Sequence, residues 1–303
     1  YGTVTAKKLG TTNITVKTKH FNVTATCKII VETLDEYVDI PAVMFKSLDD
    51  TAYVEYESEA SIDMKYSYNK TDWTQWDGTK LDIEVGVPVY VKGVNETLQN
   101  VRFVTSGGMI KCVGNLCHLY VEGFQTEYNN FLQNGLFQDC KNLVIVPKEL
   151  YITNMTGSTY NSMFRGCINL INVPELPATT LSERCYENMF NGCETLRVVQ
   201  FMLPATELKD SCYAGMFKGC SDLINAPYIN ANQLADSCCS EMYANCSSLV
   251  SALYIPATKL APYCYEYMYS GCTGLETASH LPATTLADAC YSGMFEGCKN
   301  LRN

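Results

Sequence analysis

The sequence predicts an α/β solenoid of about seven coils, each with one short helix and one short strand, preceded by all-β segments. Three observations carry this prediction. A phrase of six residues begins at positions 176, 203, 229, 255 and 281, so its period is 27 at the first step and 26 at the others. Each copy is followed by two cysteines that lie eight residues apart. The residues before the repeats alternate and are rich in threonine and valine, which is typical of strands.

The repeated phrase is Leu-Pro-Ala-Thr-Thr-Leu in its first clear copy, residues 176–181. It returns at residues 203–208, 229–234, 255–260 and 281–286. Two cysteine columns follow it, the first formed by Cys185, Cys212, Cys238, Cys264 and Cys290, and the second by Cys193, Cys220, Cys246, Cys272 and Cys298. Degenerate copies ending at Cys140 and Cys167 extend the array. We therefore assign residues 123–303 to the solenoid.

Within one unit, Leu181, Cys185, Met189 and Cys193 recur every four residues. We interpret this spacing as the inward stripe of a short helix. Residues 170–176 are too few for a helix and include a proline, so we expect a strand there. One unit cannot bury its own apolar face, but units stacked at about 4.8 Å per coil share a core. The first two copies of the phrase, at residues 176–181 and 203–208, are one residue further apart than later copies. We expect the extra residue, within positions 198–202, to form a bulge or loop.

Two β segments are expected before the repeats. Residues 1–33 contain alternating Thr- and Val-rich stretches. Residues 34–122 contain several short strand-like stretches with frequent turn signals, which predicts a small sandwich. The polar stretch 69–78 holds both tryptophans, Trp73 and Trp76. An exposed pair could stack on sugar rings, whereas a buried pair would belong to the sandwich core, and we prefer the core.

Sixteen cysteines admit three explanations: disulfides, metal ligands and buried thiols. Cysteine packs as a small apolar side chain, which suits an inward-facing ladder. Neighbouring ladder Cα atoms would lie within disulfide range, but their Cβ vectors would run parallel. There is no Cys-x-x-Cys pair, so no metal is predicted. We expect reduced, buried ladder thiols, and we note that Cys239 could pair or react and that Cys112 and Cys117 could form a local bridge.

Catalysis finds little support in the sequence. His20, His118 and His280 are scattered over three segments, and no nucleophile elbow or phosphate loop occurs. We predict that the chain is not an enzyme, has no catalytic residue and needs no cofactor.

One column of residues is a candidate ligand-binding surface. It lies just before the closing Leu or Ile of each predicted strand, and we call it the strand-side row: Glu149, Glu175, Met202, Tyr228, Tyr254 and His280. Solenoids bind through variable side chains on a regular scaffold, and aromatic residues are favoured at contact hot spots. The alternative is that these residues merely cover the sheet.

A period of about 26 residues lies in the leucine-rich-repeat range. The phrase Leu-Pro-Ala-Thr-x-Leu-x-x-x-Cys-Tyr-x-x-Met-Phe-x-Gly-Cys-x-x-Leu resembles the BspA-like leucine-rich-repeat family of bacterial surface proteins over residues 123–303. Gly2-x-Val4-Thr5-Ala6, with Ile14-Thr15-Val16 and Ala25-Thr26-Cys27, resembles the C-terminal third of a bacterial Ig-like group 2 domain. Residues 34–122 resemble the β-module that often precedes such repeats. These resemblances imply adhesion and protein contacts, with the chain secreted or displayed at the cell surface.

The net charge and the hydropathy of the chain disfavour two classes of binding partner, nucleic acid and membranes. The formal net charge of −10 disfavours nucleic acid and anionic membrane surfaces. No run of 18 apolar residues occurs, so no membrane insertion is expected within the chain. The chain begins at Tyr1 without Met or a signal segment and stops within a repeat, and we expect it to be a piece of a longer protein.

The leading hypothesis is a non-enzymatic extracellular or cell-surface binding and adhesion protein whose solenoid contacts an extracellular protein. One alternative is a carbohydrate-binding protein, in which the tryptophan loop or Tyr228 and Tyr254 stack on a glycan. A second alternative is a structural spacer without a ligand. Met294, Phe295 and Leu301 would border an apolar edge at the last coil, which predicts self-association through that coil.

Overall fold

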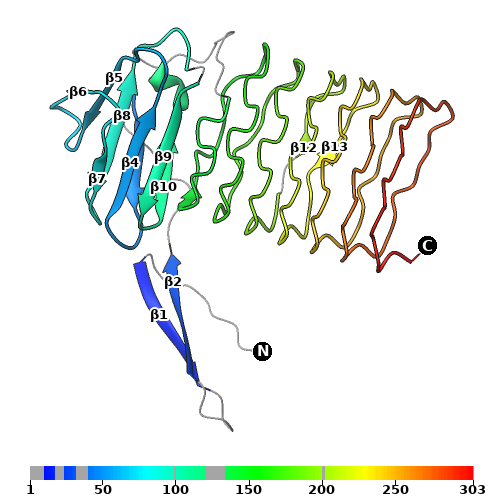
Figure 1. Ribbon diagram of the computed structural model, residues 1–303, viewed down its shortest axis with the longest axis horizontal. Helices are drawn as coiled ribbons and strands as arrows, with labels where there is room; N and C mark the ends of the chain where they lie inside the picture. The colour runs from blue at the N-terminus through cyan, green and yellow to red at the C-terminus, as the bar shows by residue number, and fades with distance from the viewer. Residues whose placement is uncertain are drawn as a thin grey trace.

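The structure is a computed structural model that describes residues 10–17, 24–31, 40–98, 100–120, 134–199 and 202–302. Its N-terminal element is a hairpin of β1 (Gly10–Lys17) and β2 (Thr24–Val31). The two strands pair antiparallel along their whole length, from Gly10 opposite Val31 to Lys17 opposite Thr24. The hairpin is followed by a two-sheet sandwich and then by a stack of coils (Figure 1).

Two sheets form the sandwich. The larger has the strand order β11-β10-β3-β8-β5-β6 and the smaller the order β7-β4-β9. Their bounds are β3 (Val43–Ser47), β4 (Ala52–Glu57), β5 (Met64–Ser67), β6 (Thr74–Trp76), β7 (Leu81–Ile83), β8 (Val89–Gly93), β9 (Arg102–Gly107), β10 (Ile110–Gly114) and β11 (Leu143–Ile145). Residues that alternate along the strands, such as Val54, Val91 and Phe103, are fully buried between the sheets. This alternation is what two packed sheets require.

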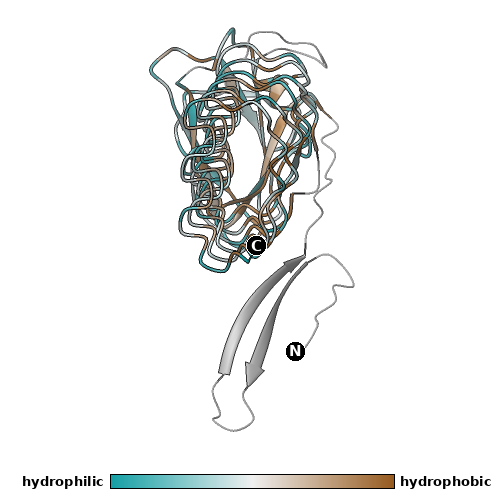
Figure 2. Cartoon of the chain, turned by 90° about the vertical axis from the view of Figure 1, so that its right-hand side faces the viewer, coloured by the Kyte–Doolittle hydropathy of each residue, from teal (hydrophilic) through white to brown (hydrophobic). Residues whose placement is uncertain are grey.

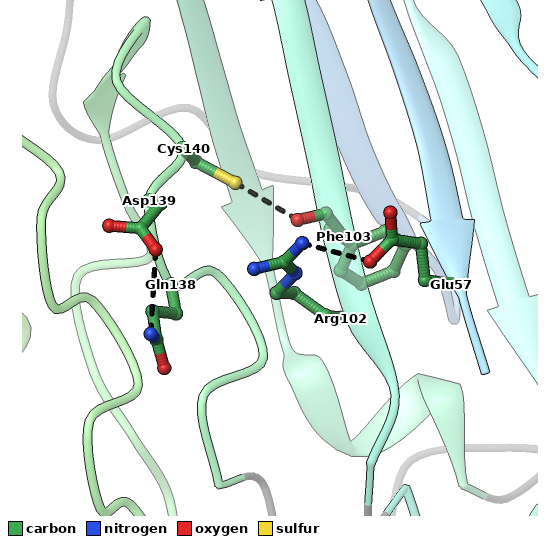
Figure 3. A network of polar contacts seen from close by, with 6 residues as sticks. All are labelled: Glu57, Arg102, Phe103, Gln138, Asp139 and Cys140. Carbon is green, nitrogen blue, oxygen red and sulfur yellow. Dashed lines mark hydrogen bonds and ion pairs between the residues drawn. The ribbon is translucent and has the colours of Figure 1, made fainter. Parts of the chain in front are cut away.

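The sandwich and the coil stack share one core. Strand β10 pairs in parallel with β11, which belongs to the first described coil. The Phe103 amide donates to the Leu136 carbonyl at 2.8 Å, and the Cys140 thiol donates back to the Phe103 carbonyl at 3.2 Å. Figure 3 shows this junction, with the Arg102–Glu57 ion pair of 2.9 Å beside it. The sandwich therefore covers the N-terminal end of the stack.

The prediction of an α/β solenoid with one helix per coil is wrong. Among the described residues the helical element is the short 3-10 helix η1 (Leu116–Leu119), which precedes the repeats. The expected helices are successions of turns instead. The Met189 amide donates to the Tyr186 carbonyl at 3.2 Å, and the Cys193 amide to the Phe190 carbonyl at 3.1 Å, so each bond spans three residues.

The four-residue spacing of the inward residues explains why turns form in place of the expected helices. An α-helix turns once per 3.6 residues, so a stripe at four-residue steps drifts by about 40° at each step and leaves one face. In the structure every fourth residue has a positive φ, as in Arg184 (56°), Asn188 (56°) and Gly192 (77°). These left-handed residues restart the turn, which keeps Cys185 and Met189 pointing inward. Successive coils follow one outline when seen along the stack (Figure 2).

The strand side of each coil is short. Strands β12 (Met202–Leu203) and β13 (Tyr228–Ile229) pair in parallel, and other coils are joined there by single bridges such as Glu149 with Glu175. Val198 pairs with Asn225, and Met202 pairs with Tyr228. Along the sequence, Val198 lies one residue further from its partner than Met202 does from its own. The extra residue therefore lies between Val198 and Met202, in the expected interval, although residues 200 and 201 lie outside the described part of the chain.

Stacked aromatic rings run through the core from the sandwich to the last coil. Ring centroids of consecutive members lie 5.3 to 6.1 Å apart, with interplanar angles of 4° to 21°. The members are Trp76, Phe103, Phe137, Phe164, Phe190, Phe217, Tyr243, Tyr269 and Phe295. From Phe137 onward, each ring stacks on the equivalent ring of the next coil, so the packing of the core fixes the register of the repeats. The described residues include no helix long and apolar enough to span a bilayer.

Candidate binding surface

The strand-side row lies on the outside of the coil stack. Met202, Tyr228 and Tyr254 are 54%, 61% and 59% exposed, although large apolar side chains favour burial. Glu175 and His280 are exposed as well. The parallel pairing of Met202 with Tyr228 places these two side chains side by side on neighbouring coils. The structure thus brings together the apolar members of the predicted row.

A groove of ≈ 590 Å³ lies along this row. Met202, Tyr228 and Tyr254 border it, and Asn225 and Ser251 are the polar residues of its lining. The remaining lining residues are aliphatic, and no charged side chain takes part. We call it the strand-side groove. Its chemistry suits an uncharged, largely apolar ligand that offers a few hydrogen bonds.

Two buried tyrosine hydroxyls hold the backbone behind the groove. The Tyr243 hydroxyl donates to the Pro227 carbonyl at 3.1 Å, and the Leu253 amide donates to the Tyr269 hydroxyl at 3.1 Å. The same column carries phenylalanine in the preceding coils, where no hydroxyl is available. The column changes from phenylalanine to tyrosine between Phe217 and Tyr243, in the coils that form the groove. The new hydroxyls bond to backbone groups next to Tyr228 and Tyr254.

Part of this surface was not predicted from the sequence. Val198 and Val250 are partly exposed, and Val250 and Ser251 line the groove. The sequence does hold a signal for Val250. The position four residues after each cysteine of the second column is occupied in successive coils by Ile171, Arg197, Ile224, Val250 and Glu276. Apolar residues in an exposed column that elsewhere carries charge indicate a functional surface.

The second cysteine column forms a ladder of thiol donors. Each thiol donates to the carbonyl of an aromatic residue in the preceding coil or, for Cys140, in the sandwich, at 3.1 to 3.2 Å. The donors are Cys140, Cys167, Cys193, Cys220, Cys246, Cys272 and Cys298. Burial raises the pKa of Cys140 and of Cys272 to about 12. These thiols keep their protons at neutral pH, as a donor must.

The first cysteine column is also buried but bonds more weakly. Cys185, Cys212, Cys238, Cys264 and Cys290 are buried, whereas Cys298 of the second column is half-buried. The Cys212 and Cys264 thiols lie 3.9 Å from the carbonyls of Cys238 and Cys290. Both columns therefore act as packing elements in the core of the coil stack.

No protein-family model, curated protein or solved structure matches the chain.

The two tryptophans are not brought together. Trp76 is buried against Tyr56 and Phe103, and its Nε1 donates to the Thr79 carbonyl at 2.6 Å. Trp73 is half-buried on the other side of the larger sheet, where Lys92 Nζ lies 4.4 Å from its ring centroid. Only Trp73 reaches the surface, and Lys92 covers its ring, so the pair does not form a platform for sugars.

The other candidate groups are dispersed or enclosed. His118 is buried and His280 is exposed, while His20 lies outside the described residues. In the described part of the chain, no group of three or more His, Cys, Asp or Glu side chains is placed to hold a metal ion.

The remaining cysteines are also enclosed. Cys112 and Cys117 are buried free thiols, and burial raises the pKa of Cys117 to about 11. Cys239 is buried between the coils of Tyr213 and Tyr265, where it replaces the ring of its column.

Proposed function

We propose that this chain is a non-enzymatic binding protein that holds a protein ligand in the strand-side groove. The observation that carries the proposal is the exposure of Met202, Tyr228 and Tyr254 on consecutive coils around one groove. Tyrosine is enriched at interface hot spots, where its ring is buried and its hydroxyl finds a partner. Covering such side chains removes apolar surface from water, which contributes roughly 25 cal/mol per Å² before the entropic cost of association is subtracted.

The chemistry of the groove supports a polypeptide ligand. Its lining is uncharged and mostly aliphatic, which favours apolar side chains over phosphate groups. The net charge of −10 also repels nucleic acid at a distance. A short extended segment with one or two apolar anchors would fit a groove of ≈ 590 Å³.

The resemblance to BspA-like surface proteins supports a location outside the cell. An oxidising exterior usually converts paired cysteines to disulfides. The ladder thiols are compatible with that environment because they are enclosed in the core, and burial raises the pKa of Cys193 and of Cys246. A protonated, inaccessible thiol reacts slowly with oxidants.

Tyr228 and Tyr254 also support a second candidate, a glycan-binding protein, because exposed tyrosine faces stack on sugar rings. The test is a panel of extracellular matrix proteins and a glycan array, probed with the intact chain and with the double variant Tyr228→Ser/Tyr254→Ser. Tyr68→Ser, an exposed tyrosine of the sandwich, is the matched control. We expect a protein ligand whose affinity falls at least about tenfold in the double variant and is unchanged in the control.

Three outcomes would contradict the proposal. A ligand bound equally well by the double variant would place the binding site elsewhere. Binding to glycans alone would establish the second candidate. Binding to neither panel would favour a structural spacer.

A further inference from the structure

Three successive coils line the strand-side groove, and they carry Met202, Tyr228 and Tyr254 in turn. The first coil is joined to the second where β12 pairs with β13 (Figure 1). The third is joined by a single bridge to the coil that follows it. No backbone hydrogen bond or bridge connects residues 222–234 to residues 249–260, all of which the structure describes. The strand side of the stack is therefore interrupted between the second and third coils of the groove.

The bonds on either side of the interruption show what is missing. Between the first and second coils, the Ile224 amide donates to the Arg197 carbonyl at 2.8 Å, and the Val199 amide donates to the Asn225 carbonyl at 3.2 Å. The third coil and the coil after it are joined at the equivalent positions by bonds of 2.8 and 3.0 Å. Each of these two junctions thus holds one bond in each direction.

The same positions are unpaired at the interruption. They are the Ile224 carbonyl and the Ala226 amide on one wall of the groove, and the Val250 amide and the Ser251 carbonyl on the other. None of these four groups bonds to another described residue. Ala226 is buried and Ile224 is half-buried, and unpaired backbone groups are rare in such places. The groove therefore contains two donors and two acceptors of the main chain that need partners.

The buried tyrosine hydroxyls keep the two walls apart. The Tyr243 hydroxyl bonds to the Pro227 carbonyl, and the Tyr269 hydroxyl accepts from the Leu253 amide. Each bond joins a wall to the turn side of its own coil and not to the facing wall. The unpaired groups beside them are therefore a built feature of the groove.

We propose that the groove binds an extended polypeptide segment whose main chain supplies the missing hydrogen bonds. This inference rests on the proposed function and specifies its ligand. The Ile224 carbonyl and the Ala226 amide flank Asn225, so one residue of a parallel segment can donate its N–H to the first group and accept from the second. The other wall offers one donor and one acceptor as well.

Main-chain bonding and side-chain contacts divide the recognition. Backbone hydrogen bonds supply affinity in strand addition, and the pockets between them select side chains. Apolar side chains of the segment would contact Tyr228 and Tyr254. The residue that donates to the Ile224 carbonyl must carry an N–H, so it cannot be proline.

The test begins with a phage-displayed library of random heptapeptides, selected on the intact chain and counter-selected on the Tyr228→Ser/Tyr254→Ser variant. A selected peptide is then synthesised with capped ends and as a series in which each backbone amide in turn is N-methylated. Methylation removes a donor and leaves every side chain in place. We expect at least about tenfold weaker binding at one or two internal positions and little change at the ends.

Amide hydrogen exchange in the protein provides the matched readout. Ile224, Val250 and Glu276 occupy equivalent positions in successive coils, but only the Ile224 and Glu276 amides are bonded. In the free chain the Val250 amide should exchange at least about tenfold faster than these two. Bound peptide should slow exchange at Val250 and Ala226 and leave Ile224 unchanged.

Different results overturn this inference and the proposed function. Peptide binding that needs Tyr228 and Tyr254 but tolerates N-methylation at every position would overturn the main-chain bonding and leave the proposed function standing. A Val250 amide that is protected like Ile224 in the free chain would do the same, as would a tyrosine-dependent protein ligand with no selectable peptide. Ligands that bind the double variant equally well would overturn both.

Discussion

The side chain of Asn245 lies over Gly271 of the next coil, where an added Cβ would collide with Asn245 Oδ1. Both residues have a positive φ, of 64° and 73°. Glycine and asparagine are among the residues that adopt this conformation most easily. The same contact joins Asp139 to Gly166. A side chain in one coil and a glycine in the next therefore allow the turns to stack closely.

This contact predicts that Gly271→Ala destabilises the chain strongly. The variant combines left-handed strain, worth about 1 kcal/mol, with a clash against a polar side chain, and we expect a total loss of roughly 2–4 kcal/mol in the free energy of unfolding. Gly86→Ala is the matched control, because Gly86 has a φ of 86° but no atom within 4 Å of its added Cβ. Denaturant unfolding measures both. Equal losses would show that strain alone accounts for the effect.

The tyrosine hydroxyls near the groove predict a second pair of effects. Tyr269→Phe removes the acceptor of the Leu253 amide and should cost about 1–3 kcal/mol. Tyr213→Phe removes a buried hydroxyl that has no hydrogen-bond partner in the described residues, so its effect should be close to zero or stabilising. Thermal unfolding of the two variants is the measurement. A larger loss for Tyr213→Phe would contradict the assigned hydrogen bonds.

The thiol ladder predicts protection and a cost for its removal. Ladder cysteines should resist a thiol probe in the native protein, and most should react under non-reducing denaturation. Cys246→Ala deletes a buried sulfur and its bond of 3.1 Å to the Phe217 carbonyl, so we expect a loss of about 1–3 kcal/mol. Mass spectrometry of the labelled protein counts the thiols. Loss of more than half of them to disulfides would contradict the ladder.

Stability should fall in alkaline solution. Burial raises the pKa of Cys140 and of Cys272 to about 12 from the ordinary 9.0. The folded state then holds protons that the unfolded chain releases, so the stabilising contribution is complete below about pH 9 and is lost between about pH 9 and pH 12. Each such thiol lowers the free energy of unfolding by about 1.4 kcal/mol per pH unit in that window. Denaturant unfolding across this pH range tests the sign, and unchanged stability at pH 11 would contradict it.

The repeat, its register and the inward cysteine columns were predictable because identical coils must stack identical side chains. The turn structure was not predicted, because an apolar residue at every fourth position also suits one face of a short helix. A signal against a helix was present in the sequence: Asn188, Gly192, Gly215 and Gly219 place residues tolerant of positive φ at the same four-residue interval. Such residues are poor helix formers, and their regular spacing is typical of linked turns.

The candidate site was predicted in part. Tyr228 and Tyr254 were identifiable because the column that carries them varies from coil to coil. The groove was not, because its lining comes from three successive coils and depends on how they stack, which no single repeat of the sequence shows. The two tryptophans needed the sheet geometry to be distinguished, because Trp76 lies on strand β6 and points into the core whereas Trp73 precedes it.

The backbone hydrogen bonds between the turns of neighbouring coils take the place of the expected helices, and scalar coupling across a hydrogen bond tests them directly. In deuterated protein the Phe190 amide nitrogen should couple to the carbonyl carbon of Met216, its acceptor at 2.8 Å in the next coil. In a helix the same amide would bond four residues back, to the carbonyl of Tyr186. Coupling from Phe190 to Met216 is the predicted result, and coupling from Phe190 to Tyr186 would contradict the account.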